Sequence, residues 1–121
     1  MYLKRILAAV LVLGFLPITQ ARAESLLFSI RNDYPYTLML VFYSDDRNWE
    51  WPGDDQAYVL DDNRIHDYPL NCNYGEKICY GAWPKGSRKY YWGVGQDRSH
   101  YCTDCCYVCN GGETGVIVLN D

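Results

Sequence analysis

The stretch YTLMLVFY, residues 36–43, is apolar or aromatic on both of the faces that an extended chain presents. Successive side chains of a β-strand point to opposite sides of its sheet, so a strand with one solvated side alternates apolar with polar residues. This stretch shows no such alternation. It therefore predicts a central strand of a packed sheet.

The segments on either side carry strand periodicity and turn chemistry. Upstream, residues 26–31 alternate, with Phe28 and Ile30 on one side. The next four residues, NDYP at 32–35, predict a turn because Asn and Asp bond to nearby backbone and Pro fixes φ. Downstream, residues 44–56 form a long polar connection, and we expect the next strand after it.

Further strand-like runs lie at residues 57–60, 65–72, 77–83, 89–94 and 115–119. A turn at residues 74–77 predicts a hairpin that brings Cys72 opposite Cys79, and a turn at 84–87 predicts a second hairpin. A cysteine-rich loop spans residues 95–112. Seven or eight short strands without helical periodicity predict an all-β fold, a small antiparallel sandwich or barrel.

The first 23 residues have the organisation of a secretory signal peptide. Lys4 and Arg5 precede a mostly apolar run at residues 6–19, and Ala21-Arg22-Ala23 has the small-x-small form that a signal peptidase cuts after. The run is too short and wrongly flanked for a membrane anchor. We therefore expect a helical signal peptide at 1–23 and a single domain at 24–121, periplasmic or secreted and not inserted in a membrane after cleavage.

The charge of the expected mature domain is strongly negative. Removal of 23 residues leaves 121 − 23 = 98, and it removes three of the 11 basic residues but none of the 15 acidic ones, so the net charge is 8 − 15 = −7. This size and charge exclude a multidomain enzyme, a Rossmann-type cofactor fold and an electrostatically driven nucleic-acid binder. A cationic protein partner is favoured instead.

Six cysteines in a short exported chain predict a disulfide framework, because oxidising compartments form such bonds and keep them. The cysteines are Cys72, Cys79, Cys102, Cys105, Cys106 and Cys109. Three bridges would stabilise a domain whose small core leaves it a thin margin of stability.

The cluster CxxCCxxC at residues 102–109 has two other interpretations. It contains two CxxC zinc half-sites, but the adjacent Cys105 and Cys106 make a poor four-ligand cage. A redox dithiol needs a low thiol pKa, which Asp104 opposes. Within the disulfide interpretation, a bond between the adjacent cysteines would strain the peptide. Two arrangements stay open: a Cys72–Cys79 bridge, or both of these residues bonded to the 102–109 loop.

Several short segments of the sequence resemble segments found in an uncharacterised group of small exported cysteine-rich bacterial proteins. They are GEKICYGAW at 75–83, WGVG at 92–95 and the cluster at 102–109, with FYS at 42–44, WPG at 51–53 and YVLDD at 58–62. The similarity covers residues 32–110. It implies a periplasmic or secreted bacterial protein, and it carries no activity, ligand or catalytic residue.

Catalytic motifs are missing from the sequence. It contains no Gly-x-Ser-x-Gly, no His-Glu-x-x-His and no phosphate-binding glycine loop, and its two histidines, His66 and His100, are expected to be surface or hydrogen-bonded residues. The acidic doublets at 45–46, 54–55 and 61–62 could supply calcium ligands, but none has the EF-hand pattern. We predict no catalytic residue, no cofactor and no metal site.

Trp49 and Trp51 are the best candidates for ligand binding. They lie in the long polar connection among Arg47, Glu50 and Asp54, and long loops on rigid β scaffolds often carry function. Trp83 and Trp92, by contrast, lie within predicted strands and are expected in the core. The sequence thus predicts a non-catalytic binding module for a protein or glycan ligand. The alternatives are an inhibitor of a basic secreted enzyme, a small secreted hydrolase and a metal-binding protein.

Overall fold

The computed structural model describes Gly14 and residues 22–120. Most of the predicted signal peptide, residues 1–13 and 15–21, lies outside this part, so that assignment stays a prediction. No helix among the described residues is long and apolar enough to cross a membrane.

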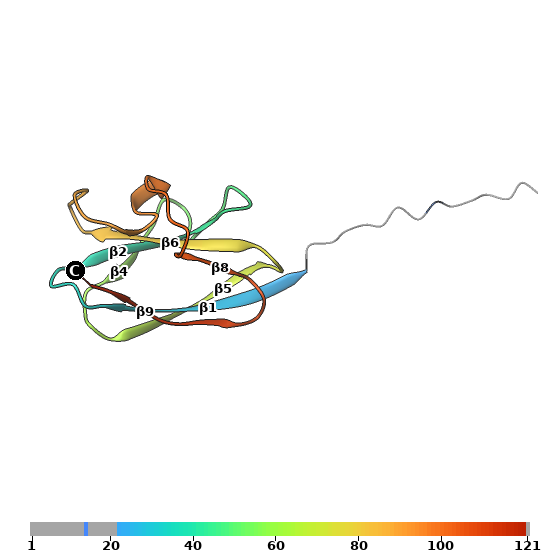
Figure 1. Cartoon of the computed structure of the whole chain (residues 1–121), viewed down its shortest axis with the longest axis horizontal. Coiled ribbons are helices and arrows are strands. Elements are labelled where there is room, and N and C mark those ends of the chain that lie inside the picture. Colours follow the sequence, from blue (N-terminus) through green and yellow to red (C-terminus); the bar gives the residue numbers. More distant parts are fainter. Residues whose placement is uncertain (1–13, 15–21, 121) are drawn as a thin grey trace, which may run out of the picture.

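The described residues form two β-sheets that face each other and do not close into a barrel (Figure 1). The strands are β1 (Ala23–Asn32), β2 (Leu38–Ser44), β3 (Glu50–Trp51), β4 (Tyr58–Leu60), β5 (Ile65–Asn73), β6 (Lys77–Pro84), β7 (Trp92–Gly93), β8 (Cys106–Val108) and β9 (Glu113–Leu119). A short 3-10 turn, η1 (Gln96–Arg98), precedes β8. The all-β prediction is confirmed, and of its two forms the sandwich is correct.

The smaller sheet has the strand order β5-β1-β9. The β1–β5 pair is antiparallel, but β9 runs parallel to β1, with Ile30 beside Ile117. The sequence predicts antiparallel pairing, and this parallel pair is the exception to it. The chain leaves β8 in the opposite sheet and crosses over near the start of β1, so β9 has to run in the direction of β1. Parallel neighbours require such a crossover.

The larger sheet contains β3, β2, β6 and β7 in that order, with β4 also paired to β2 and β8 to β6. The predicted central position of residues 36–43 is confirmed, because β2 pairs with β6 on one side and with β3 and β4 on the other. β6 and β7 also pair as the second predicted hairpin requires, although only Gly81 and Ala82 of β6 take part.

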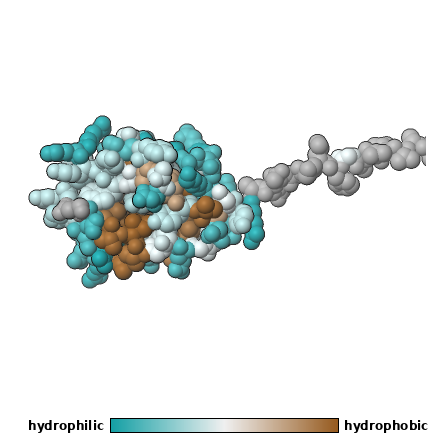
Figure 2. Space-filling model, viewed as in Figure 1, coloured by the Kyte–Doolittle hydropathy of each residue, from teal (hydrophilic) through white to brown (hydrophobic). Residues whose placement is uncertain are grey.

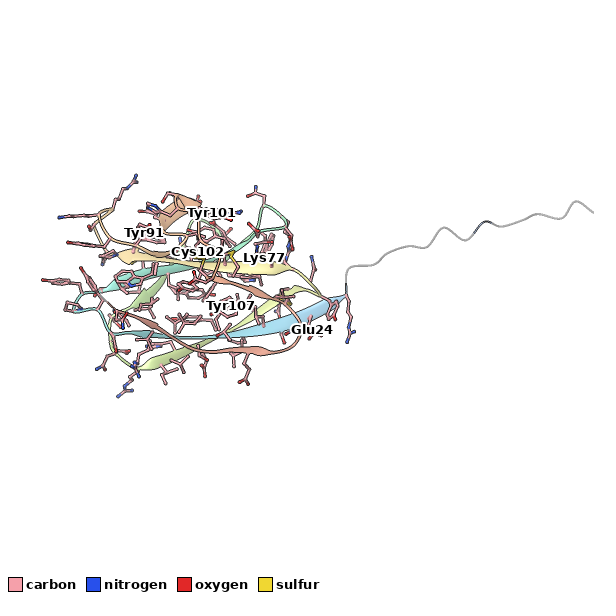
Figure 3. The ribbon with its side chains drawn as sticks, in the orientation of Figure 1. Glu24, Lys77, Tyr91, Tyr101, Cys102 and Tyr107 are labelled. Carbon is pink, nitrogen blue, oxygen red and sulfur yellow. A yellow bond between two sulfur atoms is a disulfide. The ribbon has the colours of Figure 1, made fainter. Side chains whose placement is uncertain are left out.

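Different parts of the chain cover the two apolar faces of β2. Phe42 points between the sheets and is fully buried, with its ring 4.4 Å from that of Phe28 on β1. Val41 and Tyr43 point the other way and pack against the segment 94–106. Tyr107 of β8 also contacts Phe28 between the sheets (Figure 3). Because both faces of β2 are buried, residues 36–43 do not alternate between apolar and polar side chains.

The first predicted hairpin, with Cys72 opposite Cys79, is wrong. β5 belongs to the smaller sheet and β6 to the larger one, so residues 74–76 form an arch between sheets. Leu70 and Ile78, on the two sides of the arch, face the same core. The predicted register would have placed Leu70 and Ile78 on opposite faces of one sheet, because Leu70 would share a face with Cys72 and Cys79 and Ile78 would not.

All six cysteines of the chain lie among the described residues and form disulfides, as predicted. The pairs are Cys72–Cys109, Cys79–Cys106 and Cys102–Cys105. Of the two arrangements that the sequence left open, the correct one bonds both upstream cysteines to the 102–109 segment. The adjacent cysteines are not bonded to each other, as expected.

Apolar side chains also remain on the surface at the edges of the two sheets (Figure 2). Val116 of β9 is 49% exposed and Val108 of β8 is 52% exposed. Trp92 joins the two edges, because its indole Nε1 donates a hydrogen bond to the carbonyl of Asn120 at 2.7 Å. The expectation that Trp83 and Trp92 pack in the core is confirmed, with Trp92 half-buried.

Candidate functional site

Among the described residues, Glu76 is the one buried carboxylate, and it lies in the arch between β5 and β6. Its side chain is 2% exposed. It accepts hydrogen bonds from the Ser44 hydroxyl at 2.6 Å and from the Asn73 amide at 3.0 Å. Arg47 donates two more, from Nε and, at 3.1 Å, from Nη2. A buried charge needs such partners, because burial without them is costly.

These partners determine the protonation of Glu76. Burial by itself raises the pKa of a carboxyl group, because it disfavours the charged form. The hydrogen bonds from Arg47, Ser44 and Asn73 outweigh burial and hold the pKa of Glu76 below its ordinary value. The residue is therefore ionised at neutral pH, and Arg47 is paired with a full negative charge.

Ser44, at the end of β2, links the carboxylate of Glu76 by hydrogen bonds to the loop that follows the strand. Its hydroxyl donates to Glu76 and accepts the amide hydrogens of Asp46 and Arg47, each at 3.2 Å. Its own amide donates to the Trp49 carbonyl at 2.9 Å, which closes the loop. The loop is thus held at both its start and its end by a buried polar centre.

The guanidinium of Arg47 lies beside both predicted binding residues. It is 5.1 Å from the ring centroid of Trp49 and 5.9 Å from that of Trp51. Both distances are within the range of a cation–π interaction. Because Glu76 fixes the guanidinium, the guanidinium in turn fixes the orientation of the exposed indole of Trp49.

The structure separates the roles of the two tryptophans. Trp51 belongs to β3, where it pairs with Phe42 and packs against the core, so it is half-buried. Trp49 lies in the loop and is 55% exposed. The prediction that both lie in an irregular loop is therefore wrong for Trp51, whose two-residue strand is too short to leave a periodic pattern. The binding role of the pair stays a prediction.

A hollow of about 650 Å³ opens beside the two tryptophans. We call it the Trp49 hollow. It is lined by Arg47, Asn48, Trp49, Glu50, Trp51, Pro52, Gly53, Asp54, Asp55 and, from β5, Asn71. Gly53, Asp54 and Asp55 all have positive φ, a conformation that Asp tolerates better than most residues. This turn places two exposed carboxylates on the rim of the hollow.

The electrostatics of the Trp49 hollow are negative. Its one cation, Arg47, is neutralised by Glu76, which lies outside the lining. Glu50, Asp54 and Asp55 have no ion pair with any cation in the described part of the chain. The hollow therefore offers an exposed indole ring beside three unpaired carboxylates.

Most of the other residues singled out in the sequence have partners within the fold. His66 lies 2.7 Å from the Asp62 carboxylate, and the ring of His100 stacks on Tyr91 at 3.5 Å. Asp45 pairs with Lys77 and with Arg98. In the part that the structure describes, no group of three or more His, Cys, Asp or Glu residues is arranged to hold a metal ion.

Comparison with protein-family models, curated proteins and solved structures gives no match to this chain. The resemblance noted in the sequence therefore stays a prediction.

Sequence reasoning missed the central role of Glu76. A single glutamate between glycine and lysine in a polar turn has the pattern of a solvated residue, and no local signal marks it as buried. Its partners, Ser44 and Arg47, are about 30 residues away in the chain. Only the arch between the sheets brings the three together.

Proposed function

We propose that this protein is a non-catalytic binding module that captures a cationic segment of another exported protein in the Trp49 hollow. The observation that carries the proposal is the position of the exposed Trp49 indole beside the unpaired carboxylates of Glu50, Asp54 and Asp55. A lysine or arginine side chain gains a cation–π contact and an ion pair in such a place.

The rigid support of Trp49 favours recognition. An indole that is already held by Arg47 and Glu76 loses little conformational freedom when it binds, and this pre-organisation raises affinity. Tryptophan is also among the residues that contribute most to binding energy at protein interfaces. Asp54 and Asp55 are exposed on the rim of the hollow, where their charges can contact a cation of a partner, and this favours surface recognition.

Export is the second part of the proposal. The three disulfides support an oxidising compartment, the periplasm or the outside of the cell, because thiols stay reduced in the cytosol. The net charge of −7 after the expected cleavage would steer a basic partner towards the domain from a distance. Inhibition of a basic secreted enzyme is the narrower form of this proposal, and the same hollow would then cover the enzyme's basic surface.

A calorimetric titration with an oligo-lysine peptide tests the proposal. We expect Trp49→Ala to weaken binding about tenfold, because a central aromatic contact contributes more than 1 kcal/mol. Tyr101→Ala is the matched aromatic control, because Tyr101 is 92% exposed and lies outside the hollow. Its affinity is expected to equal that of the wild type.

Two double variants test whether the carboxylates of the Trp49 hollow bind the peptide. Asp54→Asn with Asp55→Asn removes two charges from the hollow, whereas Asp61→Asn with Glu113→Gln removes two from elsewhere on the surface. We expect the first double variant to bind the peptide several-fold more weakly than the second. Equal weakening by both would mean that only the net charge matters, and the assignment to this hollow would be wrong.

A further inference from the structure

A second aromatic surface lies at the other end of β2. The turn 33–36 precedes β2, and the loop 85–91 follows β6 beside it; Figure 1 shows this loop in orange at the upper left, far from the teal loop that carries Trp49. The seven residues of β2 separate the two ends by about 20 Å, at roughly 3.3 Å per residue. Tyr36 is 68% exposed and Tyr90 is 50% exposed on this surface.

The tyrosines of the turn are held by a buried side chain. Asn32 is 4% exposed, and its Nδ2 donates to the carbonyls of Tyr36 at 3.0 Å and Leu60 at 3.1 Å. Its Oδ1 accepts the amide hydrogen of Tyr34 at 2.8 Å. The amide of Lys85 donates to the Thr37 carbonyl at 3.0 Å, which fixes the loop 85–91 against the same turn. These hydrogen bonds therefore fix the backbone that carries the exposed rings of Tyr36 and Tyr90.

The rings form a continuous group around Tyr34. Its centroid is 5.7 Å from that of Tyr36, 6.3 Å from that of Tyr90 and 5.0 Å from that of Trp92. A shallow hollow of about 460 Å³ lies over these rings, with Lys85 on its rim. We call the group of Tyr34, Tyr36, Tyr90 and the adjoining basic residues the tyrosine–lysine surface.

Three basic residues of the loop 85–91 belong to this surface, and they differ from most other cations of the domain. Lys85, Arg88 and Lys89 make no ion pair within the described residues, whereas Arg31, Arg47, Lys77 and Arg98 each pair with a carboxylate. The ammonium of Lys89 lies 5.5 Å from the ring centroid of Tyr90. A protein that is acidic overall therefore concentrates unpaired positive charge beside exposed aromatic rings.

We infer that the tyrosine–lysine surface binds an acidic polysaccharide, a chain of sugar rings that carry carboxylate or sulfate groups. Aromatic faces stack against the C–H faces of sugars, and tyrosine hydroxyls both donate and accept hydrogen bonds, as sugar hydroxyls do. Lys85, Arg88 and Lys89 provide the charge complement to the acidic groups. A neutral sugar would leave the charge of these three residues unused.

Binding to a panel of oligosaccharides tests the inference with the full chain. Calorimetry compares oligogalacturonate and a heparin octasaccharide with neutral cello-oligosaccharide, an oligo-glutamate peptide and single-stranded DNA. We expect at least one acidic oligosaccharide to bind, with an affinity that falls as salt is added. The neutral oligosaccharide, the peptide and the DNA are expected to bind at least tenfold more weakly.

Variants locate the binding on the surface. Tyr36→Ala with Tyr90→Ala is expected to weaken oligosaccharide binding about tenfold. Lys85→Gln, Arg88→Gln and Lys89→Gln should each weaken it about threefold, the effect of an exposed ion pair. All five residues are exposed or on loops, so these variants are expected to fold.

Controls separate this surface from the Trp49 hollow. Tyr101→Ala and Trp49→Ala are expected to leave oligosaccharide binding unchanged, since both residues lie outside the surface; Figure 3 labels Tyr101 on the loops above the larger sheet. The inference is overturned if neither acidic oligosaccharide binds, or if the neutral one binds equally well. It is also overturned if the peptide or the DNA binds as tightly as the acidic oligosaccharide does and is weakened equally by the variants of Tyr36 and Lys85.

Discussion

The replacement of Glu76 by Gln is the sharpest test of the way the fold supports the Trp49 hollow. The carboxylate is 2% exposed and accepts four hydrogen bonds, two of them from Arg47. A glutamine amide presents NH₂ where a second acceptor oxygen is needed, so donors of Arg47 or Asn73 lose their partner. We expect the free energy of unfolding to fall markedly.

The size of the loss follows from the surroundings of the pair. Breaking a fully buried ion pair costs about 3–5 kcal/mol. The side chain of Arg47 is 37% exposed, so water recovers part of this cost for the arginine. We expect a loss of about 2–3 kcal/mol, a large part of the roughly 5–15 kcal/mol that stabilises a domain of this kind.

Urea unfolding under oxidising conditions measures this loss, with an unchanged slope as the sign that only stability is affected. Glu113→Gln is the matched control, because Glu113 is exposed on β9 and is expected to change stability by less than about 0.5 kcal/mol. If Glu76→Gln were as stable as this control, the buried charge would not be the support that we describe.

The pH dependence provides an independent check on the same residue. The pKa of Glu76 is lowered by folding, from an ordinary value of 4.5. The stability that the charge contributes is therefore fully present above that value and is lost as the pH falls through the lowered folded-state pKa. The difference in stability between the wild type and Glu76→Gln should shrink in acid, and a constant difference would contradict this linkage.

Three further outcomes are expected. Replacing both Cys72 and Cys109 with Ala opens a loop closed at a sequence separation of 37, which should cost roughly 3–4 kcal/mol in urea unfolding; a loss below 1 kcal/mol would contradict the role of this bridge. Burial raises the pKa of Tyr43 to about 12, so the stability that its neutral phenol contributes should be lost as the pH rises from 10 through that value, and Tyr43→Phe should remove the corresponding step in absorbance at alkaline pH. Trp51→Ala should lower the melting temperature clearly more than Trp49→Ala, because only Trp51 packs against the core; equal melting temperatures would refute this division of roles.

The local pattern of the sequence was enough to predict the longer strands and much of the core, but not the short strands β3 and β8. Alternation at Phe28 and Ile30 and the doubly apolar stretch 36–43 correspond directly to β1 and β2, because each pattern reports which faces of one strand are buried. Six cysteines in a short chain with a signal-like start likewise predicted the disulfides. Strand periodicity depends on neighbouring residues only, and the cysteine count depends on composition, so neither requires knowledge of the topology.

The assignment of strands to sheets could not be predicted in the same way. The turn at residues 74–77 has the same composition whether it joins partners in one sheet or arches between two sheets, so Cys72 was wrongly placed opposite Cys79. The parallel position of β9 depends on the crossing of residues 109–112 to the start of β1, and the sequence of β9 itself carries no sign of its partner strand. The burial of Glu76 and the packing of Trp51 follow from these long-range arrangements and have no local signal.

The pairing of the cysteines has a consequence for how the chain matures. Cys72 and Cys79 enter the oxidising compartment before residues 102–109 if the chain is exported from its N-terminus, and at that moment each is the other's only possible partner. A bond between them would be non-native, because their final partners are Cys109 and Cys106. The protein should therefore depend on a disulfide isomerase, and its yield should drop in cells that oxidise thiols but cannot reshuffle them.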